Sequence, residues 1–258
     1  MEIRKNWYKI ISILGLALQL AKANFKLKNE GSFIGIFWYL LEPFLLFAII
    51  LGIQSTFWGG FKEGYPLYLL LGLIMFNFFS VTTGTVTGVI AGSSNLIKSI
   101  KINHESLIIS KVLEGIISHF FEILLFIGFM IYFKSSLVWI LIYPLIFGFF
   151  VLFVLGVSFI LATLGVYIVD MNNAWRVITR LLFFLTPLFY VVEKGTLLYQ
   201  ISLFNPVFYF ITIARELIIN NSIPKYWMIE IAIGVSLISF VAGVFVFNRY
   251  KNKFAEMV

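Results

Sequence analysis

The chain has no cysteine, which excludes disulfide bonds, thiolate metal sites and cysteine nucleophiles. It is also short of charge: charged residues make up 12% of the 258 positions, whereas soluble domains carry about 25%. Hydrophobic residues make up 61%, and the mean hydropathy is +1.00. This composition predicts an integral membrane protein, with residues 1–258 as a single all-helical membrane domain.

Recognisable catalytic motifs are lacking as well. No lysine follows a glycine, so the phosphate-binding pattern G-x-x-x-x-G-K-[ST] is absent. The two histidines, His104 and His119, have no metal-ligand spacing with each other or with carboxylates. We therefore expect no catalytic residues, no metal site and no cofactor in this chain, and a lipid-modifying membrane enzyme is the least favoured interpretation.

Two long runs without any charged residue are the strongest positive signal. They cover 34 residues between Glu63 and Lys98, and 35 between Lys134 and Asp170. A helix needs roughly 20 apolar residues to cross a bilayer core. The gaps between charges predict six transmembrane helices, at about Ile36–Trp58, Tyr65–Ala91, Leu107–Phe133, Val138–Ile168, Trp175–Val192 and Trp227–Phe247.

Residues 193–226 do not fit this scheme. The segment is too short for two spans and too apolar for a solvated loop, and Asn205-Pro206 interrupts it near its middle. Proline breaks the helical hydrogen-bond ladder and disfavours helix at the residue before it. We therefore expect an outer re-entrant helical hairpin before the last span.

The distribution of Lys and Arg predicts the orientation. With six spans and both termini in the cytoplasm, 14 of the 19 basic residues are cytoplasmic. A seventh span would place the basic C-terminal end outside. The net charge of +7 accordingly indicates orientation in a membrane rather than binding to nucleic acid.

Residues 1–30 are predicted to form an amphipathic interfacial helix. Lys5, Lys9, Lys22 and Lys26 fall on one helical face and apolar residues on the other. A cleaved signal peptide is the less favoured alternative. The helix would serve as an anchor or as a sliding or gating element.

Several residues inside the spans are candidates for function. Lys111, Glu114, Ser118 and Glu122 share one side of the third span, where charges usually face a bundle interior or a wet cavity. Glu122 lies deepest, so we predict a role in the substrate path or a subunit interface, while Lys111 and Glu114 could simply pair with each other.

Aromatic and small residues add further candidates. Trp38 and Tyr39, at the cytoplasmic mouth of the first span, could contact sugars or be ordinary interface anchors. Gly84, Gly88 and Gly92 form a small-residue stripe, for which close helix packing is favoured over a polar pore face.

At residues 31–43 the chain reads GSFIGIFWYLLEP, and this resembles permease subunits of polysaccharide-exporting ABC transporters, the Wzm and teichoic-acid type. The matching residues are Ser32, Gly35, Trp38, Leu41 and Pro43. The segment Asn95-Leu96-Ile97-Lys98 is similar to the family's pattern ahead of the cytoplasmic coupling helix. Further residues typical of the family follow in the same order along the chain, namely Asp170, Pro187, Tyr190, Asn205-Pro206 and Arg215.

The resemblance implies a homodimer driven by two separate ABC ATPase subunits, which would hold ATP and Mg. The cargo would be a lipid-linked polysaccharide, such as O antigen on an undecaprenyl pyrophosphate carrier, moved across the inner membrane of a bacterium. The alternative is an ABC permease for a drug or a small lipid.

The resemblance also assigns residues to roles. A coupling helix over residues 93–106 would contact the ATPase through Asn95, Leu96, Ile97, Lys98 and Lys101. Arg4, Lys5, Lys9, Ser32 and Gly35 would form the headgroup-binding or access region. Pro187, Tyr190, Asn205, Pro206 and Arg215 would form the outer gate.

Overall fold

The computed structural model describes residues 2–30, 35, 37–58, 64–93 and 103–254. Within these ranges the chain forms helices and no β-strand, which confirms the predicted fold class. The helices are α1 (Glu2–Asn29), α2 (Phe37–Trp58), α3 (Tyr65–Val86), α4 (Val89–Gly92), α6 (His104–Tyr132), α7 (Tyr143–Tyr167), α8 (Met171–Leu185), α9 (Leu197–Leu203), α10 (Pro206–Ile218) and α11 (Tyr226–Tyr250), with short 3₁₀ turns at Val138–Ile142 and Lys251–Lys253.

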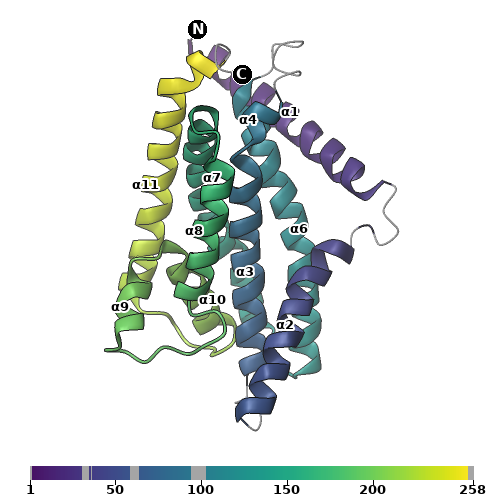
Figure 1. The fold of residues 1–258 in the computed structure, drawn as a ribbon, viewed down its shortest axis with the longest axis vertical. Coiled ribbons are helices and arrows are strands. Elements are labelled where there is room, and N and C mark those ends of the chain that lie inside the picture. The colour runs from purple at the N-terminus through teal and green to yellow at the C-terminus, as the bar shows by residue number, and fades with distance from the viewer. Residues whose placement is uncertain (1, 31–34, 36, 59–63, 94–102, 255–258) are drawn as a thin grey trace.

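The long helices stand side by side along one axis (Figure 1). Both ends of the chain and α4 lie at one end of the bundle, called here the terminal end, and α9 and α10 lie toward the opposite, hairpin end. Helices α8, α3 and α2 form one side of the bundle, and α11 packs extensively against α7. Helix α1 slants outward from the terminal end and packs on α6.

Within the described residues, five helical segments are long and apolar enough to cross a membrane, or six if the bent pair α9–α10 is counted as one span. They are Ile10–Lys28, Tyr65–Val86, His104–Tyr132, Val138–Tyr167 and Tyr226–Lys253. The predicted first span corresponds to α2, whose apolar part is shorter, at Leu40–Thr56. The first segment belongs to α1, so its placement in the membrane interface stays a prediction.

The predicted fifth span was wrong at both ends. Helix α8 begins at Met171 and ends at Leu185, because Pro187 disfavours helical dihedrals at the residue before it, and Thr186 is extended, at φ −87° and ψ 131°. Arg176 and Arg180 were counted among the cytoplasmic basic residues, although the predicted fifth span contains both, and they lie in the second and third turns of α8.

The broken hairpin is confirmed. Helices α9 and α10 meet at an angle of 103° across the break before Pro206. Asn205 caps α10, because its Oδ1 accepts a hydrogen bond from the Val207 amide at 3.1 Å. Its Nδ2 donates to Thr186 Oγ1 at 2.6 Å, which ties the hairpin to the end of α8.

A buried arginine holds the hairpin against the break after α8. Arg215 is 4% exposed. Its guanidinium donates to the carbonyls of Tyr68, Pro187 and Leu188 at 3.0, 2.6 and 2.8 Å. The Arg215 Cζ atom also lies 3.4 Å from the centre of the Tyr68 ring. Gly72 leaves the space that this side chain fills, since a Cβ there would meet the guanidinium.

Close helix contact occurs at glycines other than those predicted. A Cβ on Gly156 of α7 would meet the backbone of Ser239 on α11, and one on Gly243 would meet the Gly156 backbone. By contrast, a Cβ on Gly84, Gly88 or Gly92 would meet nothing within 4 Å. The close packing expected at that stripe is therefore not found within the described part of this chain.

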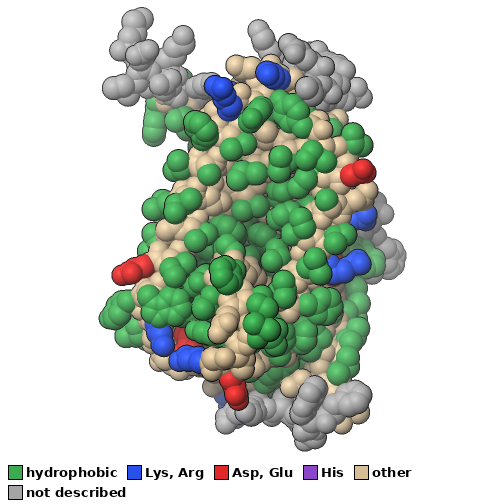
Figure 2. Space-filling model, turned by 60° about the vertical axis from the view of Figure 1, so that its left-hand side comes forward, with side chains coloured by type: hydrophobic (Ala, Val, Ile, Leu, Met, Phe, Trp, Pro, Cys, Tyr) green, Lys and Arg blue, Asp and Glu red, His purple; other side chains and the backbone are tan. Residues whose placement is uncertain are grey.

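Turned so that the α11 side comes forward, the surface is mostly hydrophobic (Figure 2). The few charged side chains on it lie mainly toward its ends and edges. Exposed side chains of α11 such as Ile238, Val241 and Phe245 contribute to this apolar surface. Such a surface suits lipid rather than water.

The α7–α11 contact leads to a prediction with a matched control on one helix. Gly156→Ala should lower the apparent melting temperature of the purified protein in detergent, because the methyl group meets backbone that cannot yield, and overpacking costs about 1–3 kcal/mol. Gly148→Ala, where a Cβ meets nothing within 4 Å, should leave it unchanged or raise it, since alanine favours helix. Equal melting temperatures for the two variants would contradict the close contact.

Candidate functional site

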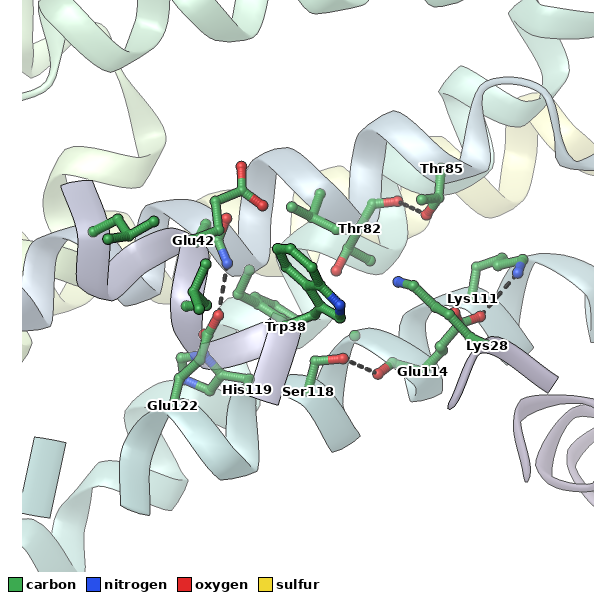
Figure 3. A pocket seen from close by; sticks show the side chains of 16 residues that line it. Lys28, Trp38, Glu42, Thr82, Thr85, Lys111, Glu114, Ser118, His119 and Glu122 are labelled. Atoms are coloured by element: carbon green, nitrogen blue, oxygen red, sulfur yellow. Dashed lines mark hydrogen bonds and ion pairs between the residues drawn. The ribbon is translucent and has the colours of Figure 1, made fainter. Parts of the chain in front are cut away.

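A cavity of about 530 Å³ opens between α2, α3 and α6 in the terminal half of the bundle (Figure 3). Trp38 and Glu42 line it from α2, Thr82 and Thr85 from α3, and Lys111, Glu114, Ser118 and Glu122 from α6, with Lys28 at the end of α1. Two of the residues predicted for the substrate path, Trp38 and Glu122, thus lie in the wall of one cavity.

Glu122 is part of a buried chain of hydrogen bonds. Its Oε1 accepts from Asn77 Nδ2 at 2.6 Å, and its Oε2 lies 3.0 Å from His119 Nδ1. The other ring nitrogen of His119 is 2.6 Å from the Tyr143 hydroxyl. These contacts join α3, α6 and α7. His119 and Glu122 are each only 2% exposed, so the carboxylate is taken out of lipid and held by its partners.

Aromatic rings fix the histidine within this network. The His119 ring stacks on Phe147 at a centroid distance of 4.3 Å and touches Phe78 at 5.3 Å. The sequence singled out Glu122 as a costly charge but missed Asn77 and Tyr143. Asn77 was detectable as a lone amide within the apolar run of α3, whereas nothing in the sequence marks Tyr143 among twelve tyrosines.

The other end of the cavity carries an ion pair. Lys111 Nζ lies 2.8 Å from Glu114 Oε2, one helical turn apart, so these two residues follow the simpler pairing interpretation. The Ser118 hydroxyl donates to the Glu114 carbonyl at 3.1 Å. Thr82 Oγ1 is buried and has no hydrogen-bond partner among the described residues. It lies where a Cβ on Gly115 would fall, so α3 and α6 approach closely here.

Trp38 projects into the space between α3 and α6, and it is 55% exposed (Figure 3). It follows Gly35, whose φ of +54° lies in the left-handed region that favours glycine. The Trp38 amide donates to the Gly35 carbonyl at 3.3 Å, which starts α2. The side chain of Tyr39, the other predicted rim residue, lies outside what the structure describes.

The remaining predicted residues divide into two groups. Ser32 and the coupling segment Asn95, Leu96, Ile97, Lys98 and Lys101 lie outside the described residues. Arg4, Lys5 and Lys9 belong to α1, but their side chains are not described.

The residues predicted for the outer gate do come together. The Tyr68 hydroxyl donates to the carbonyls of Pro187 and Tyr190 at 3.3 and 3.2 Å, beside Arg215. Asn205 and Pro206 start α10 against Thr186. A gating role for this cluster stays a prediction.

A second cavity, of about 1500 Å³, lies in the hairpin half of the bundle. It is bounded by α2 and α8, with α3 between them. Its wall is rich in aromatic side chains, namely Tyr65, Tyr68, Phe183, Phe184, Phe189 and Tyr190. Residues from α2 and α3 line both cavities, and α6 completes the first whereas α8 completes the second, so the side of the bundle along α2 and α3, called here the hollow side, has a cavity in each half.

The chain matches the family described as "ABC-2 type transporter" over residues 16–219. It is also similar to two Klebsiella pneumoniae proteins named O-antigen export system permease protein RfbA. Each is 25% identical over 266 residues, covering 97% of this chain and 98% of the relative. A Myxococcus xanthus protein of the same name is 20% identical over 249 residues, covering 95% of each chain.

The buried network leads to a prediction. Tyr143→Phe should lower the apparent melting temperature in detergent by the equivalent of about 1–3 kcal/mol, because it leaves a buried nitrogen of His119 unpaired. Tyr132→Phe, at a site 78% exposed, should change stability by less than about 0.5 kcal/mol. In a Glu122→Gln background the cost of Tyr143→Phe should differ from its cost alone. Strictly additive effects would show that the hydrogen bonds do not act as one network.

Proposed function

Because the chain belongs to the ABC-2 type transporter family, we propose that it is the membrane subunit of an exporter for a lipid-linked, O-antigen-like polysaccharide. The names of the relatives, which match over nearly their whole length, support this choice of cargo. The carrier would be undecaprenyl pyrophosphate, and the membrane would be the inner membrane of a bacterium.

The observation that carries the proposal is the hollow side along α2 and α3. The cavity with Trp38 lies in its terminal half, and the aromatic cavity lies in its hairpin half. Flat aromatic rings contact the C–H faces of sugars without demanding one pattern of hydrogen bonds, so a polymer can slide along them. A drug or small lipid would not need two such cavities along the length of the bundle.

One chain leaves this side open, so a second copy facing it would complete a channel. ATP and Mg would bind two separate ATPase subunits. The segment at residues 93–106 would dock on them through Asn95, Leu96, Ile97, Lys98 and Lys101. The basic residues of α1, Arg4, Lys5 and Lys9, together with Ser32 and Gly35, would attract the pyrophosphate headgroup near the cytoplasmic surface.

The first test is genetic. Cells lacking this protein should accumulate the lipid-linked glycan on the inner side of the membrane. When the Trp38→Ala variant is expressed in these cells, long polymers should be exported about fivefold more slowly than with the unchanged protein, while ATP hydrolysis continues. A fivefold change is the equivalent of ~1 kcal/mol of lost contact. Phe37→Ala is the matched control, because Phe37 is exposed on the same helix but does not line the cavity.

Normal glycan distribution in cells without the protein would refute the proposed cargo. Equal export by the Trp38→Ala and Phe37→Ala variants would leave Trp38 as an ordinary interface anchor. Measuring the length of the exported polymer separates these results from a general loss of protein.

The proposed orientation can be tested by labelling, because the chain has no native cysteine. Single cysteines at Lys134 and Lys194 should react with a membrane-impermeant thiol reagent added to intact cells, and one at Lys253 should react only after lysis. Lys134 and Lys194 follow helices that end toward the hairpin end, whereas Lys253 lies next to the C-terminus. Labelling of Lys253→Cys from outside would overturn the orientation.

A further inference from the structure

Helix α8 carries two arginines that the proposed function has not used. Arg176 and Arg180 are exposed on one edge of α8, next to Asn172 and Asn173, and these four residues are called the arginine edge. Arg176 Nη2 donates to Asn173 Oδ1 at 2.7 Å. Among the residues that the structure describes, neither arginine has an acidic partner.

The arginine edge extends along the bundle axis to the level of the middle of α3. Trp175 Nε1 donates to Thr83 Oγ1 at 2.9 Å, and the Phe183 ring meets that of Phe76 at 5.5 Å, so the two helices are aligned at these levels. Arg180 lies between those contacts, beside the middle of α3. At 1.5 Å per residue it is about 14 Å from the start of α8, roughly half the thickness of a bilayer core.

The same contacts set the rotation of α8 about its axis. At about 100° per residue, Arg180 points between the directions of Phe183 and Phe184 one turn further along. Both phenylalanines line the aromatic cavity. Leu181, also exposed, points about 100° away from Arg180, toward the side of α8 where the exposed residues are apolar. The arginine edge therefore borders the hollow side of the bundle.

Two exposed guanidinium groups without acidic partners are costly against lipid, so charges at this depth face water or a ligand. Arginine binds phosphate oxygens through paired hydrogen bonds, and it stays charged under all ordinary conditions. We propose that Arg176 and Arg180 form an anion site in the wall of the conduit, which binds the phosphate groups of the cargo while the aromatic cavity contacts its sugars. The choice of cargo rests on the proposed function, whereas the anion site does not.

Thiol labelling tests whether the arginine edge is wet and attracts anions. Arg180→Cys and Leu181→Cys are placed singly in the full chain, assembled with its ATPase in lipid nanodiscs. Cysteine at 180 should react with small water-soluble thiosulfonates at least tenfold faster than cysteine at 181. At Arg180→Cys, an anionic reagent should react about fivefold faster than a cationic one, because Arg176 attracts the negative charge. Arg176→Gln should abolish that preference.

Phospholipid headgroups are the other source of phosphate, and a second arm separates them from the cargo. Inorganic pyrophosphate should slow labelling of cysteine 180 in nanodiscs of zwitterionic lipid, and equally in discs that contain anionic lipid. Arg176→Gln should remove this protection. Protection by anionic lipid, with no further effect of pyrophosphate, would mean that the arginines bind headgroups and would overturn the proposal.

Equal reactivity of the two cysteines, or none at either, would also overturn it, because α8 would then not present its arginines to a wet path. These readouts need no transport. The proposed cargo could fail in the genetic test while the anion site stands, and the labelling could fail while glycan export is confirmed.

Discussion

Where α8 stops before Pro187, the chain runs without helix among long apolar helices, and the carbonyls of Pro187 and Leu188 lose their helical partners. Lipid offers no replacement, because an unsatisfied backbone group in hydrocarbon costs several kcal/mol. Arg215 supplies the missing donors from α10 and binds the Tyr68 carbonyl of α3 with the same guanidinium. The broken hairpin, the end of α8 and the wall of the aromatic cavity all depend on this one side chain.

Helix α3 connects α6 on one flank with α8 on the other. One side of it shares the Asn77–Glu122 hydrogen bond with α6, and another holds Trp175 of α8 through Thr83. Its remaining side faces the two cavities. Because the contacts on its two flanks fix its position, α3 can present a polar and partly open surface within an otherwise apolar bundle. A buried polar network thus stabilises the wall of the proposed path without blocking it.

The sequence predicted the helices well where the signal was a long run without charge, as for α3 and α7. It failed at the end of α8, because the apolar residues continue beyond Pro187 although the helix does not. The charge count treated Arg176 and Arg180 as cytoplasmic although the predicted fifth span contains both, because counting charges ignores that a wet face can hold arginines within a membrane helix.

Within the candidate site, a costly charge was recognisable but its partners were not. Glu122 stands out in an apolar helix, whereas the helices that bring Asn77 and Tyr143 to it are far apart in the sequence. The glycine stripe was misjudged for a similar reason. Spacing shows that three glycines share a face, but only the packing shows which glycines have another helix against them, such as Gly156 and Gly243.

The contact between those two glycines makes the two sides of the bundle mechanically unequal. Helices α7 and α11 touch through their backbones, so neither can slide or tilt without a clash, and together they behave as a stiff plate. Helix α2 lies on the far side of α3, and its contacts with α6 include the Phe47 ring against that of Phe129 at 5.3 Å. Pro43, in the second turn of α2, removes one hydrogen bond from the helical ladder and makes this helix easier to bend. Both cavities are lined by α2 and α3 rather than by the stiff α7–α11 pair, so the hollow side widens by bending or displacement of α2, and its width is set there.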